Sequence, residues 1–263
     1  MFDRNCPLIN RPLINRPLII AALAAGITLS AAAHAGSNRT SATLSNRDLV
    51  VPGSTLLVDG GPRWLLPEGQ FVYQKNDGDD PAWVNAGLTF GIGGKFQLGV
   101  VQPIQVLPDD VDLHDPRIHI LYQFVEGVAD VGVFAQGNIP IEGDPGVIAG
   151  LPVQLHLGSY ARFDTGPFIR AGFPEDDPWL DFTAPFVLNI NVTRQFFLGP
   201  EAAIWTENEF DYVRVPAGFF LGYTMADGGE TLGDLSLRFR DLNVRDSGNV
   251  VQLIFAADLF FDF

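Results

Sequence analysis

The sequence predicts an all-β fold, a transmembrane antiparallel up-and-down β-barrel of about twelve strands that follows a cleaved signal peptide. Apolar and polar residues alternate over repeated segments of about ten residues, as they do in membrane barrels. No stretch beyond the signal peptide reaches about 18 consecutive apolar residues, so a transmembrane helix is not expected. The 28 glycines, 19 prolines and 21 phenylalanines favour turns and aromatic strands over helices.

The first 35 residues have the features of a secretory signal peptide. Their apolar stretch ends in Ala33-His34-Ala35, which fits the A-x-A cleavage pattern, so we expect the mature chain to begin at Gly36. The alternative is a membrane anchor, for which the apolar core is short. The basic residues that precede the apolar stretch are Arg4, Arg11 and Arg16.

Charge and cysteine content exclude several classes of function. The formal net charge of -15 argues against nucleic-acid binding. The one cysteine, Cys6, lies in the expected signal peptide, so the mature protein should have neither a disulfide nor a thiol nucleophile. We expect residues 36–67 to form an N-terminal periplasmic arm or extra strands, and residues 68–263 to form the barrel.

Each expected strand alternates in polarity and is bounded by turn residues. An even number of strands places both ends of the barrel on the periplasmic side. The expected strands are 68–75, 82–92, 95–104, 116–125, 129–139, 150–159, 162–172, 179–190, 194–205, 211–224, 232–241 and 250–263.

The connections between these strands alternate between two kinds. One kind is mostly longer and acidic, as expected of outer loops, and the other is mostly short, as expected of periplasmic turns. Residues 225–234 are an exception, because they predict a long connection on the short side. Trp83, Trp179 and Trp205 lie beside acidic connections, where amphipathic rings would meet the membrane interface. The acidic set is 75–82, 106–116, 141–150, 173–178, 206–211 and 242–249, and the short set is 92–95, 126–129, 159–163 and 191–194.

Within a strand, one face is apolar and the other is small, polar or charged. In 211–224 the residues Phe219 and Leu221 share the apolar face, whereas Arg214 shares the other face with glycines. The apolar face is expected to meet lipid, where an arginine or lysine near mid-membrane would cost about 2–4 kcal/mol. The segment LIFAADLFFDF (253–263) alternates in the same way, with Asp258 on the polar face.

The polar faces together supply a set of side chains of both charge signs that we expect in the lumen. They could form a constriction that screens solutes, or a ladder of salt bridges that fills the bore. The expected lumen residues are Lys95, Arg117, His119, Asp130, His156, Asp164, Arg170, Asp181, Glu201, Arg214, Arg238, Arg240 and Asp258.

The closing segment has apolar residues at alternate positions, Leu259, Phe261 and Phe263, and it ends on an aromatic residue. In this it resembles Gram-negative outer-membrane β-barrel proteins, whose last strand is read by the barrel assembly machinery. The segment GLTFGIGGKFQLGVVQPI (87–104) is similar to a transporter-like outer-membrane family associated with phenol degradation, and RQFFLGPEAA (194–203) resembles the same pattern. The chain departs from that family at Gly93-Gly94, where the family has a Thr-Asp turn.

The resemblance implies an outer-membrane channel or transporter for passive passage of small, hydrophobic or aromatic solutes. It carries over no catalytic residues, so we expect no enzymatic activity. The partners it implies are the lipid bilayer, lipopolysaccharide, the barrel assembly machinery and small solutes.

Two alternatives remain open from the residues. The first is a non-conducting structural or adhesion barrel whose acidic outer loops bind divalent cations and bridge to lipopolysaccharide. Its candidate ligands are Asp109, Asp110, Asp112 and Asp115; no other cofactor is expected. The second is a barrel lipid hydrolase, for which His156 and Ser159 fall on opposite faces of one strand and His119 has no evident serine partner.

Overall fold

A computed structural model describes residues 63–75, 80–93, 95–107, 111–141, 144–158, 160–174, 178–193, 195–207, 212–227, 230–242 and 250–262. Strands of these residues form a single sheet in which every pairing is antiparallel. The described residues include no helix that is long and apolar enough to cross a membrane.

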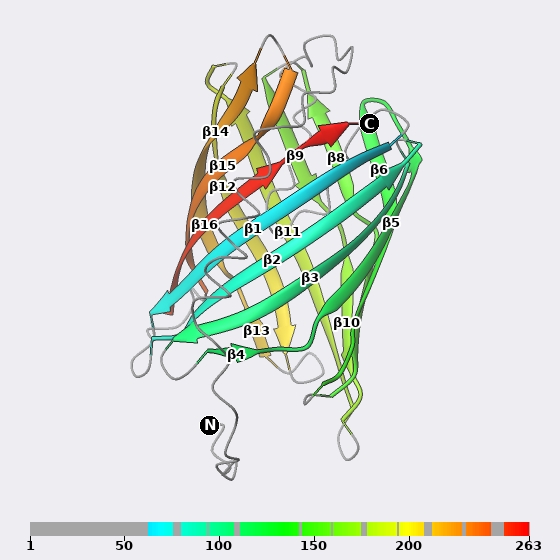
Figure 1. Ribbon diagram of the computed structural model, residues 1–263, viewed down its shortest axis with the longest axis vertical. Helices are drawn as coiled ribbons and strands as arrows, with labels where there is room; N and C mark the ends of the chain where they lie inside the picture. Colours follow the sequence, from blue (N-terminus) through cyan, green and yellow to red (C-terminus); the bar gives the residue numbers. More distant parts are fainter. Residues whose placement is uncertain are drawn as a thin grey trace. The chain divides into compact units, whose positions relative to one another are not determined.

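The strand segments follow one another around the sheet in chain order (Figure 1). They are β1 Arg63–Lys75, β2 Ala82–Ile92, β3 Phe96–Leu107, β4 Asp112–Leu113, β5 Arg117–Val125, β6 Ala129–Asn138, β7 Gly146–Gly150, β8 Val153–Leu157, β9 Ala161–Thr165, β10 Phe168–Gly172, β11 Trp179–Asn191, β12 Phe196–Glu207, β13 Tyr212–Arg214, β14 Ala217–Asp227, β15 Glu230–Asp241, β16 Val251–Leu259 and β17 Phe261–Asp262.

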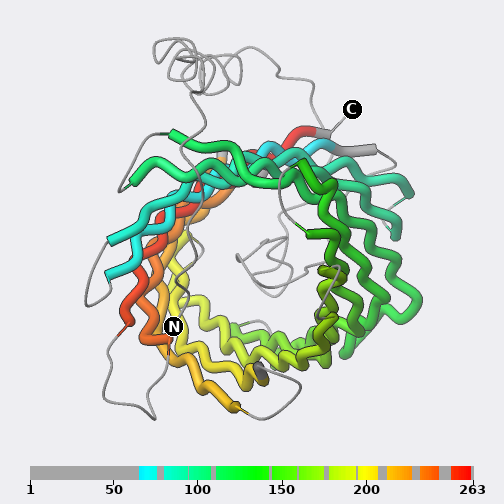
Figure 2. Tube along the Cα trace, turned by 90° about the horizontal axis from the view of Figure 1, so that it is seen from below, coloured from blue at the N-terminus to red at the C-terminus, as the bar shows by residue number. Residues whose placement is uncertain are grey.

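The sheet closes on itself through β1. This strand pairs with β2 on one side and with β16 and β17 on the other, from Trp64 opposite Asp262 to Lys75 opposite Val251. Figure 2 shows the resulting ring of strands end on. Among the described residues, β4 with β5, β7 with β8, β9 with β10, β13 with β14 and β16 with β17 each form one interrupted strand, so the barrel has 12 strands. The predicted antiparallel β-barrel of twelve strands is confirmed. The expected signal peptide and most of the expected N-terminal arm lie outside the described residues.

Prolines mark most of the interruptions. Pro116, Pro152, Pro167 and Pro216 each lie between the two segments of a broken strand. Proline has no backbone N–H and cannot donate to the ladder. Its carbonyl still accepts, because Leu151 N donates to Pro167 O at 3.0 Å and Ala203 N donates to Pro216 O at 2.9 Å. The barrel wall therefore stays continuous across these breaks.

Several predicted boundaries differ from the structure because strand pairing continues into segments with the composition of a loop. The expected acidic connection 141–150 is shorter than predicted, since β7 begins at Gly146. β1 begins at Arg63 rather than at residue 68, and it includes Pro67, a residue type that usually ends a strand. The segment 225–234 does not form a long connection, because β14 extends to Asp227 and β15 begins at Glu230. Every connection of the short set is thus a tight turn, and these turns share one end of the barrel, here called the short-turn end (upper in Figure 1).

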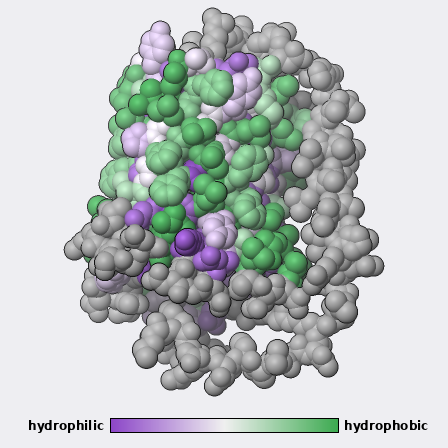
Figure 3. Space-filling view, turned by 90° about the vertical axis from the view of Figure 1, so that its left-hand side faces the viewer, coloured by the Kyte–Doolittle hydropathy of each residue, from purple (hydrophilic) through white to green (hydrophobic). Residues whose placement is uncertain are grey.

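The two faces of the wall follow the predicted alternation. In β14, Phe219 is 55% exposed and Leu221 is 47% exposed, whereas Phe220 between them is 1% exposed. In β16, Phe255 points outward and is 48% exposed, while Ile254 points inward and is buried. Figure 3 shows hydrophobic side chains gathered over one outer face of the barrel. Apolar side chains on the outer face are typical of a β-barrel that is surrounded by lipid.

An arginine placed on this outer face should destabilise the barrel in a bilayer. Leu221→Arg puts a charge at a central position of the interrupted β13–β14 strand, and we expect a loss of about 2–4 kcal/mol in the free energy of unfolding from lipid vesicles. Thr183→Arg, which places the same side chain toward the lumen, serves as the control. Denaturant titration of both variants in vesicles measures the difference, and equal losses would contradict the assignment of the two faces.

Candidate functional site

The barrel encloses a cavity of about 400 Å³ that side chains from most of its strands line. Alternate residues of a strand face the same side, so the lining comes from the inward positions of consecutive strands. Its neutral polar members include Gln70, Asn85, Thr89, Gln97 and Gln136. The cavity therefore presents water and solutes with hydrogen-bonding groups at many positions around the ring.

The expected lumen residues divide into two groups. Those that line the cavity are Arg117, His119, Arg170, Glu201, Arg238, Arg240 and Asp258. The others, which lie elsewhere in the wall, its short-turn end or its turns, are Lys95, Asp130, His156, Asp164, Asp181 and Arg214. The first group spans β5, β10, β12, β15 and β16, and its members come together only because the sheet closes.

Glu201 on β12 forms ion pairs with two arginines of β15 at the cavity wall. Its Oε2 lies 2.7 Å from Arg238 Nη1, and its Oε1 accepts from Arg240 Nε at 2.9 Å. Arg238 is 2% exposed and its guanidinium carbon lies 5.4 Å from the centre of the Phe220 ring, within the range of a cation–π contact. This ion-pair triad ties β12 to β15 across β14, which lies between them.

A row of carboxylates runs across the seam where the barrel closes. Glu68 on β1 pairs in register with Asp258 on β16, which pairs with Asp234 on β15. Glu68 accepts a hydrogen bond from Thr89 Oγ1 at 3.2 Å, and Asp234 accepts one from Thr224 Oγ1 at 2.6 Å. The sequence indicated only Asp258, because Glu68 falls at the start of the expected first strand and Asp234 falls in the expected turn.

His119 on β5 is connected to Glu68 of the row through Thr89 on β2. Its Nε2 lies 3.3 Å from Thr89 Oγ1, and its ring centre lies 5.9 Å from that of Phe134. A side chain at Gly99, opposite His119 on β3, would overlap the imidazole ring. A larger residue at position 99 would displace the His119 ring, which occupies the space over the glycine backbone.

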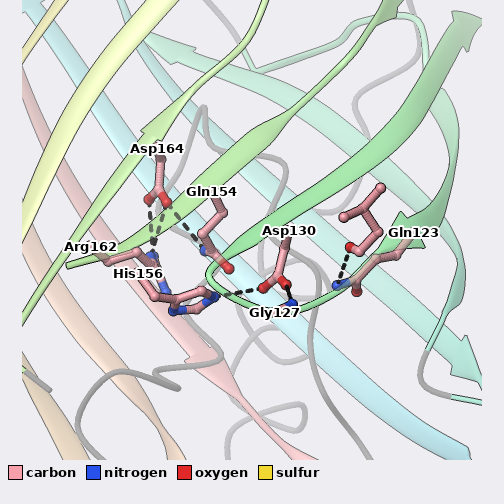
Figure 4. A network of polar contacts seen from close by, with 8 residues as sticks. Gln123, Gly127, Asp130, Gln154, His156, Arg162 and Asp164 are labelled. Carbon is pink, nitrogen blue, oxygen red and sulfur yellow. Dashed lines mark hydrogen bonds and ion pairs between the residues drawn. The ribbon is translucent and has the colours of Figure 1, made fainter. Parts of the chain in front are cut away.

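A second polar network lies near the short-turn end, on β6, β8 and β9 (Figure 4). His156 Nε2 lies 2.7 Å from Asp130 Oδ2. Arg162 forms two bonds with Asp164, at 2.9 and 3.0 Å, and Gln154 Nε2 donates to Asp164 Oδ1 at 3.2 Å. Arg162 was absent from the expected lumen set because it lies where the expected turn 159–163 overlaps the expected strand 162–172, although alternation from Asp164 places it on the same face.

The remaining expected lumen residues lie away from the cavity. Lys95 precedes the first residue of β3, and its Nζ forms a half-exposed ion pair with Glu126 at 3.3 Å. Arg214 on the short segment β13 places its guanidinium carbon 5.8 Å from the centre of the Tyr212 ring. Asp181 is buried opposite Arg170 in the β10–β11 register.

The predicted cation ligands are only partly described. Four residues of the sequence predictions lie outside the described residues: Asp109 and Asp110 of the cation ligands, Ser159 of the hydrolase alternative and Phe263 of the assembly signal. Asp115 accepts hydrogen bonds from Asn138 Nδ2 at 3.0 Å and from Ile141 N at 2.7 Å, which fixes the loop that precedes β5. Among the residues that the structure describes, no group of three or more histidine, cysteine or acidic side chains could hold a metal ion. Leu259 on β16 pairs with Gly233 on β15, and Phe261 on β17 pairs with Leu65 on β1 at the closing seam.

Replacement of Glu201 should be far more costly than replacement of an exposed acid. Glu201→Gln removes the charge that the buried Arg238 and the half-buried Arg240 share, and breaking a buried pair such as Glu201–Arg238 costs about 3–5 kcal/mol. Glu126→Gln, which breaks the half-exposed pair with Lys95, should cost about 0–1 kcal/mol. Denaturant unfolding of the two variants in detergent or vesicles gives the comparison, and similar losses would show that Glu201 is not a structural anchor.

Comparison with known proteins places the fold among porins. No protein-family model matches the sequence, and no curated protein matches it. The structure is similar to the NanC porin (TM-score 0.58, 9% identity, 75% of this chain and 100% of that chain) and to the KdgM porin (0.54, 6%, 74% and 99%). It is also similar to an outer membrane channel from Pseudomonas putida F1 (0.59, 12%, 81% and 100%). Because the sequence identities are this low, the similarity shows only a shared fold, which is a β-barrel.

Proposed function

We propose that the protein is a passive channel for small solutes in the outer membrane of a Gram-negative bacterium. The observation that carries this proposal is the division of the wall into an apolar outer face and a polar inner face around a cavity. Such a wall is stable in lipid only when every strand edge is paired, and the ladder between β1 and β16 pairs the last edges. The barrel folds similar to this one belong to proteins described as porins and as an outer membrane channel.

The inner wall has the chemistry that solute passage requires. Glutamine, asparagine and threonine side chains can replace the hydrogen bonds that a polar solute loses when it leaves water. The charges of Glu201, Arg238 and Arg240 are held in place by their ion pairs, so they line the cavity without closing over it. Contacts with lipopolysaccharide, with divalent cations at the outer loops and with the assembly machinery remain predictions from the sequence.

Purified protein in planar lipid bilayers should produce discrete single-channel currents in potassium chloride. Thr183→Trp places a large ring at the cavity wall and should reduce the conductance. Leu88→Trp places the same ring on the outer face, where Leu88 is 43% exposed, and should leave the conductance unchanged.

Absence of currents, together with absence of solute-dependent swelling of proteoliposomes, would contradict the channel. That result would favour the non-conducting structural barrel. Lipid hydrolysis by the purified protein, lost when His119 and His156 are both replaced, would instead favour the hydrolase.

A further inference from the structure

Two arginines of the cavity differ from the others in how their charge is balanced. Arg238 and Arg240 form ion pairs with Glu201. By contrast, the described part of the chain gives neither Arg117 nor Arg170 an ion-pair partner. Both line the cavity, and they are close enough for their charges to repel each other.

The surroundings of these two arginines leave them available to an anion. Arg117 is attracted to Asp115, whose carboxylate already accepts two hydrogen bonds. Arg170 lies opposite Asp181 in register, and its guanidinium carbon lies 5.8 Å from the centre of the Trp179 ring. A guanidinium can bind a carboxylate through two parallel hydrogen bonds, and such bonds are stronger than neutral ones.

An apolar cluster lies beside Arg170 on the wall that carries both arginines. The polar Gln136 is the register partner of both Ile148 and His119 on this wall. Leu121, Phe134 and Phe168 form one buried cluster, against which Ile148 packs, and all four line the same cavity. Phe134 and Phe168 meet edge to face with ring centres 6.0 Å apart. Ile148 is the register partner of Arg170, so the cluster and the cation are immediate neighbours. Gly150, opposite Phe168, has no side chain, and the phenyl ring lies over its backbone.

The opposite wall limits how much negative charge a ligand can carry. Glu68 and Asp258 line the cavity from the closing seam, and Asp234 is next to Asp258 in register. A ligand with one carboxylate can direct it toward Arg117 or Arg170 and away from this row. A ligand with several charges would bring some of them near the row, where like charges repel.

We propose that the wall formed by β5, β6, β7 and β10 is a binding site for monocarboxylates that have an aromatic or compact apolar body. The carboxylate binds Arg117 or Arg170, and the apolar body packs against Phe134, Phe168 and Ile148. A cavity of about 400 Å³ lies within the size range of small-molecule sites, which are mostly apolar with a few fixed polar groups. This site would define the class of solute that the proposed channel carries, so the inference rests on the channel function proposed above.

Binding and conduction are measured separately, so that the site and the channel can fail independently. Benzoate is the probe, and full-length protein in detergent micelles is titrated with it by saturation-transfer NMR and calorimetry. Benzyl alcohol lacks the carboxylate, gluconate lacks the apolar body, and phthalate carries a second carboxylate. Each should bind about tenfold or more weakly than benzoate, since each lacks a charge-assisted contact or an apolar contact, or meets the carboxylate row.

Variants test the two halves of the site. Arg117→Gln and Arg170→Gln together should weaken benzoate binding about tenfold or more, and Phe134→Leu should weaken it about three- to tenfold while retaining an apolar side chain. Arg214→Gln removes the same charge from outside the cavity and should leave benzoate binding unchanged. Heat-modifiable gel mobility confirms that each variant is folded before titration.

Single-channel recording supplies the second measurement. Benzoate should cause blocking events in the potassium chloride current of the wild-type protein, and the double arginine variant should lose them. Potassium chloride currents without benzoate binding would overturn the site and leave the channel standing. Benzoate binding that depends on the arginines, in a protein without currents, would support the site and overturn the channel. Equal binding of benzoate and gluconate, or binding unchanged in both the arginine and the Phe134 variants, would also overturn the site.

Discussion

The ladder between β1 and the β16–β17 pair is the constraint on which the rest of the structure depends. A strand edge left open in lipid would expose a row of N–H and C=O groups with no water to bind them, and each such group would cost several kcal/mol. Here β1 has a partner on each side, so the sheet has no free edge along its length. The proline breaks fit the same requirement, because the carbonyls of Pro167 and Pro216 still accept bonds from Leu151 and Ala203.

Closure of the barrel also determines which inward-facing side chains become neighbours. Positions that are distant in sequence, such as Glu68 and Asp258, become register neighbours only at the seam. Glu201 and Arg240 face each other across β14 because consecutive strands curve around one bore. Buried charges are stable when they are paired, as in the triad of Glu201 with Arg238 and Arg240 and in the pair of Arg162 with Asp164.

The distribution of unbalanced charge gives the cavity two unlike walls. The seam carries a row of carboxylates, whereas the wall from β5 to β10 carries Arg117 and Arg170 beside an aromatic cluster. A solute in this cavity experiences an electric field across the bore as well as an apolar surface on one side. Discrimination among solutes would then come from the position of charge relative to apolar bulk, and not from size alone.

Local chemistry along the chain was sufficient to predict the strands and their two faces. Alternation with a period of two sorts Phe219 and Leu221 from Phe220, because a strand turns successive side chains to opposite sides. The alternation of long and short connections predicted the strand count for the same local reason. Where local chemistry was misleading, at Pro67 and at residues 227–234, pairing with neighbouring strands overrode the preference of the residues for turns.

The identity of the functional neighbours was decided by the tertiary structure. Asp164 and Arg170 look alike as isolated lumen charges in the sequence, yet the structure pairs Asp164 with Arg162 and leaves Arg170 beside Ile148 on the cavity wall. Glu68, Asp234 and Arg162 lie at the ends of expected strands and were not among the expected lumen residues, although alternation from Asp164 and Arg238 places Arg162 and Asp234 on the inward face. The sequence by itself determined which residues could face inward, since alternation is a property of one strand. Only closure of the barrel determined which of them meet, since register and curvature are properties of the whole sheet.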